Sequence, residues 1–146
     1  MLDNRGGRGL ETSPCRVLVV EDFEPFRRVI RSMLETGLEL LVICEVSDGL
    51  EAVQKAGELQ PDLILLDIGL PTLDGIEAAL RIRKVAPKSR ILFLTQESSA
   101  DVVQQALSVG AAGYVLKVRV GSELLAAVEA VLQDKQFVSS GLAGQT

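Results

Sequence analysis

Short runs of apolar residues recur along the chain, and within each run the apolar positions are continuous rather than alternating with polar ones. The runs occupy Arg16–Val20, Leu40–Cys44, Leu63–Leu66, Ile91–Leu94 and Gly113–Leu116. Continuous apolarity over so few residues is typical of strands that are covered on both faces of a sheet. The pattern therefore predicts five buried strands.

The segments between these runs carry apolar residues at helical spacing and have recognisable start signals. Pro25 suits the first turn of one helix, and Asp48–Glu51 and Asp74–Glu77 each place a Glu three residues after an acidic cap. Two more helices are expected, over 98–110 and 122–134. Strict alternation of strands and helices predicts an α/β fold, a flavodoxin-like (βα)5 three-layer sandwich with a parallel five-stranded sheet of order 2-1-3-4-5.

Length and composition suit one domain with a sizeable apolar core. The chain has 146 residues, and 47% of them are hydrophobic. Residues 1–14 are rich in Gly and Arg and show no periodicity, so we expect a flexible N-terminal extension there.

Charge and residue content exclude several classes of function. A net charge of −5 argues against a nucleic-acid surface on this segment and suits a site that holds a cation. Two Cys and no His leave no zinc set, no His-based triad and no His phosphodonor. The sequence contains no stretch apolar enough to span a membrane and no signal peptide, so a cytoplasmic location is expected.

Reactive side chains follow four of the predicted strands directly. Glu21 and Asp22 follow the first strand, Asp67 the third, Thr95 the fourth and Lys117 the fifth. Carboxyl ends of parallel strands meet at one edge of the sheet, where ligands collect. Three carboxylates at one edge repel each other unless a cation intervenes.

A hard divalent cation would relieve this repulsion, and Mg²⁺ is the expected cofactor. Asp22, Asp67 and the backbone carbonyl of Gly69 are candidate direct ligands, and Glu21 is long enough to act through a water molecule. An Asp beside a metal and a Lys can also be a nucleophile toward phosphorus, because both cations neutralise the transferred phosphoryl oxygens.

These motifs together resemble the receiver domain of bacterial two-component response regulators. The resemblance covers about residues 15–134 and is carried by Val17–Asp22, Leu65–Pro71 with Asp74-Gly75, Leu94-Thr95 and Gly110–Lys117. It implies that Asp67 is the phosphoacceptor for a sensor histidine kinase and that Mg²⁺ is held by the acidic pair and Asp67. A protein of this kind is not an ordinary enzyme, since it catalyses only its own phosphorylation and dephosphorylation.

The resemblance also implies how phosphorylation is passed on. Lys117 would contact the phosphoryl group, Thr95 would move to hydrogen-bond it, and Tyr114 would change rotamer with that movement. The odd spacing of Tyr114 and Lys117 is compatible with opposite faces of a strand. The switched surface would be that of the fourth helix, fifth strand and fifth helix.

The sequence departs from the common family pattern at several positions. The acidic pair is Glu-Asp where Asp-Asp is commoner, and Val118 stands where Pro, after a cis peptide bond, is frequent. Gly69 provides no side chain to shield an acyl phosphate from water, and Glu97 lies on the opposite rim. We expect these two rim positions to set the lifetime of the phosphoryl group.

The segments Gly75–Ala79 and Gly113–Lys117 resemble receivers of the NarL/FixJ (LuxR-type) subfamily, which normally precede a helix-turn-helix domain. Residues 135–146 resemble the start of a connector to such a domain. Transcription control and DNA binding would therefore belong to residues absent from this chain. Apolar residues such as Val102, Val103 and Leu125 would support a phosphorylation-dependent homodimer, although most of a helical apolar stripe is core.

Two alternative functions stay open at the level of sequence. A Mg²⁺-dependent phosphatase with an Asp nucleophile resembles this chain in chemistry, but such enzymes carry D-x-D at the first strand, where this chain has Glu21-Asp22. A phosphorylation-independent interaction module would bind its partner equally well with and without a phosphodonor.

Overall fold

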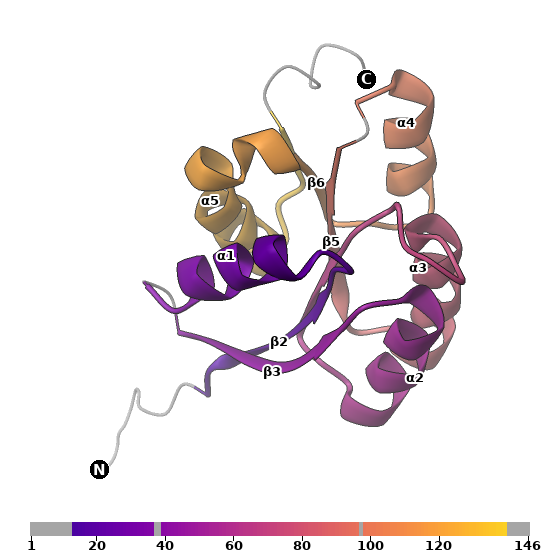
Figure 1. Ribbon diagram of the computed structural model, residues 1–146, viewed down its shortest axis with the longest axis horizontal. Helices are drawn as coiled ribbons and strands as arrows, with labels where there is room; N and C mark the ends of the chain where they lie inside the picture. The colour runs from indigo at the N-terminus through magenta and orange to yellow at the C-terminus, as the bar shows by residue number, and fades with distance from the viewer. Residues whose placement is uncertain (1–12, 37–38, 97, 140–146) are drawn as a thin grey trace.

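A computed structural model describes residues 13–36, 39–96 and 98–139. In chain order its elements are β2 (Cys15–Val20), α1 (Glu24–Leu34), β3 (Leu40–Val46), α2 (Gly49–Leu59), β4 (Leu63–Leu66), α3 (Gly75–Val85), β5 (Arg90–Thr95), α4 (Ala100–Ser108), β6 (Gly113–Leu116), the 3₁₀ helix η1 (Lys117–Arg119), α5 (Val120–Leu132) and β7 (Phe137–Val138) (Figure 1).

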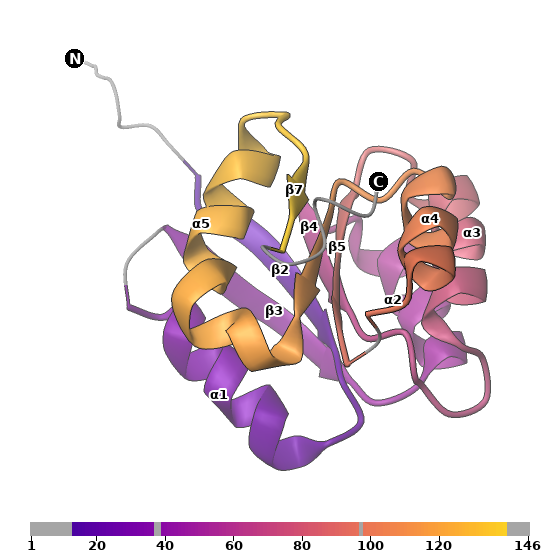
Figure 2. The ribbon, with the colours of Figure 1, turned by 90° about the horizontal axis from the view of Figure 1, so that it is seen from above.

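The strands form one parallel sheet of order β3-β2-β4-β5-β6-β7, with helices on both faces. Helices α1 and α5 cover one face, while α2, α3 and α4 cover the other (Figure 2). Each face has its own core: Ile30 and Leu124 pack on the first, and Ala79, Ile82 and Val103 on the second. The central strand β4 is buried over its whole length, as its continuous apolar sequence predicted.

The predicted fold class and the order of its first five strands are confirmed, and a sixth strand was missed. Residues 137–138, expected in the connector, pair with β6 as β7. Residues 140–146 of that range, and residues 1–12 of the expected extension, lie outside the described part. Helix α5 spans 120–132 rather than 122–134. No helix in the described ranges combines the length and apolarity that crossing a membrane requires.

Helix starts follow the capping signals in the sequence. The Asp48 and Asp74 side chains cap α2 and α3 by accepting the backbone N–H groups of Glu51 and Glu77, at 2.8 and 3.0 Å. Pro25 lies in the first turn of α1, where its missing N–H costs nothing. Each cap therefore sets the residue at which the loop after a strand ends and the next helix begins.

Candidate functional site

Three carboxylates gather where β2 and β4 end. Val20 pairs with Leu66 in the sheet, and the Asp67 N–H donates to the Val20 carbonyl at 3.1 Å, so the two strand tips lie side by side. Oxygens of Glu21, Asp22 and Asp67 all lie within 4.8 Å of one another. Glu21 and Asp67 are buried whereas Asp22 is exposed. The expected acidic cluster is therefore present.

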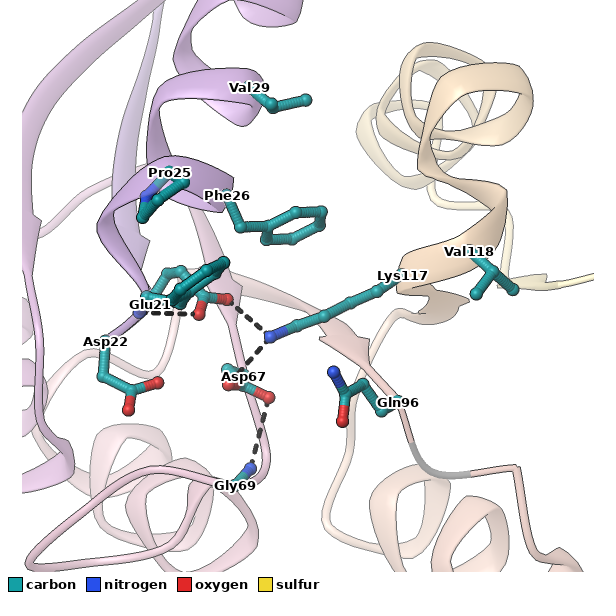
Figure 3. Close-up of a pocket in the computed structure, with 11 residues that line it drawn as sticks. Glu21, Asp22, Pro25, Phe26, Val29, Asp67, Gly69, Gln96, Lys117 and Val118 are labelled. Carbon is teal, nitrogen blue, oxygen red and sulfur yellow. Dashed lines mark hydrogen bonds and ion pairs between the residues drawn. The ribbon is translucent and has the colours of Figure 1, made fainter.

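Lys117 supplies the positive charge of this cluster from the start of η1. Its Nζ lies 2.8 Å from Glu21 Oε1 and 3.1 Å from Asp67 Oδ2, to which it donates a hydrogen bond (Figure 3). The ammonium also lies 4.9 Å from the centroid of the Phe26 ring, a cation–π distance. Lys117 thus bridges two buried acids and is held from above by an aromatic ring on α1.

Burial and charge shift the pKa values of this pair. Burial raises the pKa of the Glu21 carboxyl, and the Lys117 ammonium and the Phe23 N–H offset only part of that effect. Burial would lower the pKa of Lys117, but the carboxylates of Glu21 and Asp67 outweigh it and raise that pKa. The ionised form of the buried Glu21 carboxyl therefore depends on the Lys117 ammonium.

The acidic cluster fits a hard divalent cation. In the described part of the chain, Glu21 Oε1 is the one fully buried side-chain oxygen or nitrogen that no well-aligned hydrogen bond satisfies, and its nearest partner is the Lys117 ammonium at 2.8 Å. This carboxylate oxygen and two neighbouring Asp side chains are the oxygen donors that Mg²⁺ prefers. Gly69, the fourth candidate, donates its N–H to Asp67 Oδ1 at 3.2 Å.

The cluster forms one side of an open cavity of about 570 Å³. The cavity also has an apolar lining that was not anticipated from the sequence: Phe23, Pro25, Phe26 and Val29 at the start of α1, and Val118. Figure 3 shows Pro25, Phe26 and Val29 together on α1 and Val118 across the cavity from them. In sequence, Phe26 and Val29 have the spacing of core residues. The orientation of α1 on the sheet instead leaves Val29 half exposed at the edge of the cavity, which the sequence spacing does not reveal.

The remaining candidate residues lie at different depths. Thr95 ends β5 and is buried, and its neighbour Gln96 lines the cavity. Tyr114 is fully buried on β6, with its ring centroid 6.3 Å from that of Phe93, so it lies in the core while Lys117 points into the site.

Glu97 is outside the described residues. The Lys117–Val118 peptide is trans.

The sequence matches one protein family and several curated regulators. Residues 17–129 match the sequence family described as the response regulator receiver domain. The chain is 37% identical over 117 residues to a putative transcriptional regulator of Pseudomonas aeruginosa, covering 80% of this chain and 56% of that protein. It is 35% identical over 130 residues to the transcriptional regulatory protein LiaR of Bacillus subtilis, covering 89% of this chain and 62% of that one.

Among solved structures, a LuxR-family two-component response regulator from Aurantimonas sp. SI85-9A1 superposes with a TM-score of 0.86 at 32% identity, covering 91% of this chain and 95% of that one. The response regulator domain of Thermotoga maritima CheB superposes with a TM-score of 0.76 at 34% identity, covering 82% and 97%. The chain spans little more than half the length of the curated relatives it matches.

Proposed function

The chain belongs to the receiver domain family of two-component response regulators, and from this premise we propose that Asp67 accepts a phosphoryl group from a sensor histidine kinase. The observation that carries the proposal is the position of the Asp67 carboxylate: it lies beside the Lys117 ammonium and within one cluster with Glu21 and Asp22. The proposal includes a cytoplasmic location, where the chain would meet the sensor histidine kinase.

Hydrogen bonds to both carboxylate oxygens of Asp67 prepare it for phosphoryl transfer. Oδ2 accepts from Lys117 and Oδ1 from the Gly69 N–H, so the carboxylate is oriented before a donor arrives. A carboxylate oxygen forms the new P–O bond, while the donor's P–N bond to histidine, or P–O bond in a small acyl phosphate, breaks with its electron pair. Lys117 then faces the added negative charge.

The metal site in this proposal uses Asp22, Asp67 and the Gly69 carbonyl as direct ligands of Mg²⁺, with Glu21 acting through water. Bound there, the cation would supply positive charge to the phosphoryl oxygens. The exposed Asp22 keeps one side of the cluster open to solvent and donors. Glu21, one methylene longer than Asp, reaches Lys117 directly and holds it at the site until the phosphoryl group competes for it.

The test is covalent labelling of the whole chain. Incubation with acetyl phosphate and Mg²⁺ should add the mass of one phosphoryl group, and Asp67→Asn should abolish the gain because an amide is not a nucleophile here. Asp74→Asn is the matched control, since Asp74 caps α3 and takes no part in the cluster. An unchanged mass in the wild-type chain contradicts the proposal, and turnover of an external phosphoester would instead support the phosphatase alternative.

The switch and its output form the second half of the proposal. Thr95 and Tyr114 would carry the change at Asp67 to the surface of α4, β6 and α5, which would then form a homodimer. Val103 is buried in the core, which leaves Val102 and Leu125, both half-buried, as the apolar residues for that contact. DNA binding would belong to a helix-turn-helix domain outside this chain, joined through residues 135–146.

The lifetime of the phosphoryl group should depend on Gly69. A Cβ at this position would meet no atom within 4 Å, so Gly69→Asn fills open space at the rim. We expect the added amide to screen the acyl phosphate from water and slow hydrolysis several-fold, measured as loss of label after donor removal. Glu97→Ala tests the second position that the sequence suggested, and unchanged rates in both variants would contradict the predicted role of the two positions.

A further inference from the structure

The C-terminal end of the described chain is built into the sheet beside the site. Strand β7 pairs in parallel with β6, with Phe137 opposite Gly113 and Val138 opposite Tyr114 (Figure 2). The Ser139 N–H extends this ladder by donating to the Tyr114 carbonyl at 2.9 Å. Ser139 is completely buried, which is unusual for a hydroxyl at the end of an edge strand.

The Ser139 hydroxyl joins two other elements. It accepts the Leu116 N–H at 2.9 Å, which ends the β6 ladder in place of a further β7 carbonyl. It donates to Glu123 Oε1 in the first turn of α5 at 2.5 Å, a short contact as expected for a charged acceptor. One buried hydroxyl therefore ties the end of β6, the start of α5 and the C-terminal segment together.

The position of this anchor matters because of the residue that follows Leu116. Ser139 holds the Val115–Leu116 peptide, one peptide before Lys117. The Lys117 ammonium in turn reaches Glu21 and Asp67 across the cleft. Val118, directly after it, is 88% exposed and packs on little. The main chain at Lys117 is thus held mainly from the Leu116 side and by the turn into α5.

We infer that Ser139 is a positioning residue for Lys117, so that residues 137–139 are a working part of the phosphoryl site rather than a connector outside it. The inference rests on the proposed function, because it assigns a role in phosphorylation to the support of Lys117. Coupling is reciprocal: a change in the position of Lys117 on phosphorylation acts on β7, and through β7 on whatever follows it.

The test compares two neighbouring truncations in the full chain. Ser139→Ala removes the acceptor of the Leu116 N–H, whereas Val138→Ala removes apolar bulk from the same strand and leaves the hydroxyl in place. Ser139→Thr keeps the hydroxyl and should rescue. Glu123→Ala frees the hydroxyl without altering β7 and offers a second route if Ser139→Ala does not fold.

Two readouts decide the outcome. Phosphorylation by acetyl phosphate with Mg²⁺ should slow about tenfold in Ser139→Ala, as small misplacements of a catalytic group do, while Val138→Ala stays near the wild-type rate at comparable loss of stability. The nitrogen resonance of the Lys117 ammonium should broaden or shift in Ser139→Ala and not in Val138→Ala.

Failure of the inference is distinguishable from failure of the proposed function. If the wild-type chain takes up no phosphoryl group, the proposed function fails, and the Lys117 resonance still tests the anchor. If the wild type is phosphorylated but Ser139→Ala behaves as Val138→Ala in both readouts, or if Ser139→Thr restores stability without restoring the rate, the positioning role is overturned.

Discussion

Replacing Lys117 with methionine should lower the free energy of unfolding at neutral pH by about 3 kcal/mol, the usual scale for removing one partner of a buried ion pair. Methionine keeps the length and apolar stem of lysine but not the ammonium. Glu21, which is 1% exposed, then faces Asp67 without its cation. Urea unfolding at neutral pH measures the loss.

The pH dependence of this loss has a definite sign. Burial already raises the pKa of Glu21 above its ordinary value of 4.5, and Lys117 opposes that rise, so the variant raises it further. A carboxyl whose pKa is raised by folding destabilises the native state above that pKa and ceases to do so once protonated. The deficit should therefore shrink as pH falls through the raised pKa of Glu21 toward 4.5.

Mg²⁺ should restore part of the lost stability at neutral pH, because the metal replaces the missing positive charge and binds only the folded cluster. Lys55→Met is the matched control: Lys55 pairs with Glu58 on the exposed surface of α2, where such pairs contribute at most about 1 kcal/mol. An equal loss in the two variants, or a deficit in Lys117→Met that does not change with pH, would contradict this account of the site.

The residues of the acidic cluster could be predicted because each follows a strand directly. An apolar run such as Leu63–Leu66 fixes both the strand and the residue at its tip, and parallel pairing brings Asp67 beside Glu21 without further information. The side chains that surround the cluster depend on helix orientation. Phe26 lies over Lys117 only because α1 is rotated to place it there, and no local pattern specifies that rotation.

Strand β7 was missed for a related reason. It contains two residues, Phe137 and Val138, too few for any periodicity, and its pairing partner Gly113 is far away in sequence. A Cβ on Gly113 would come 3.0 Å from the Phe137 carbonyl, so the absence of a side chain there permits the close approach. Only tertiary structure distinguishes this strand from the connector that the sequence suggested.

Gly75→Ala should destabilise the chain by about 3 kcal/mol and displace Asp67, because a close backbone contact leaves no room for a methyl group. Gly75 is the first residue of α3, and its N–H donates to the Ile68 carbonyl at 2.7 Å. A Cβ there would lie 2.2 Å from the Asp67 carbonyl oxygen and 2.7 Å from the Ile68 Cα. Both are backbone atoms, so the loop that carries Asp67 must move.

Gly121→Ala provides the matched control in the first turn of α5, where a Cβ would meet nothing within 4 Å. Alanine is the better helix former there by up to about 1 kcal/mol, so this variant should be neutral or more stable. Urea unfolding gives both values, and the rate of phosphorylation by acetyl phosphate should fall in Gly75→Ala alone. Equal stability of the two variants would mean that α3 can move away from β4 without loss of stability. The close packing at Gly75 would then not be what positions Asp67.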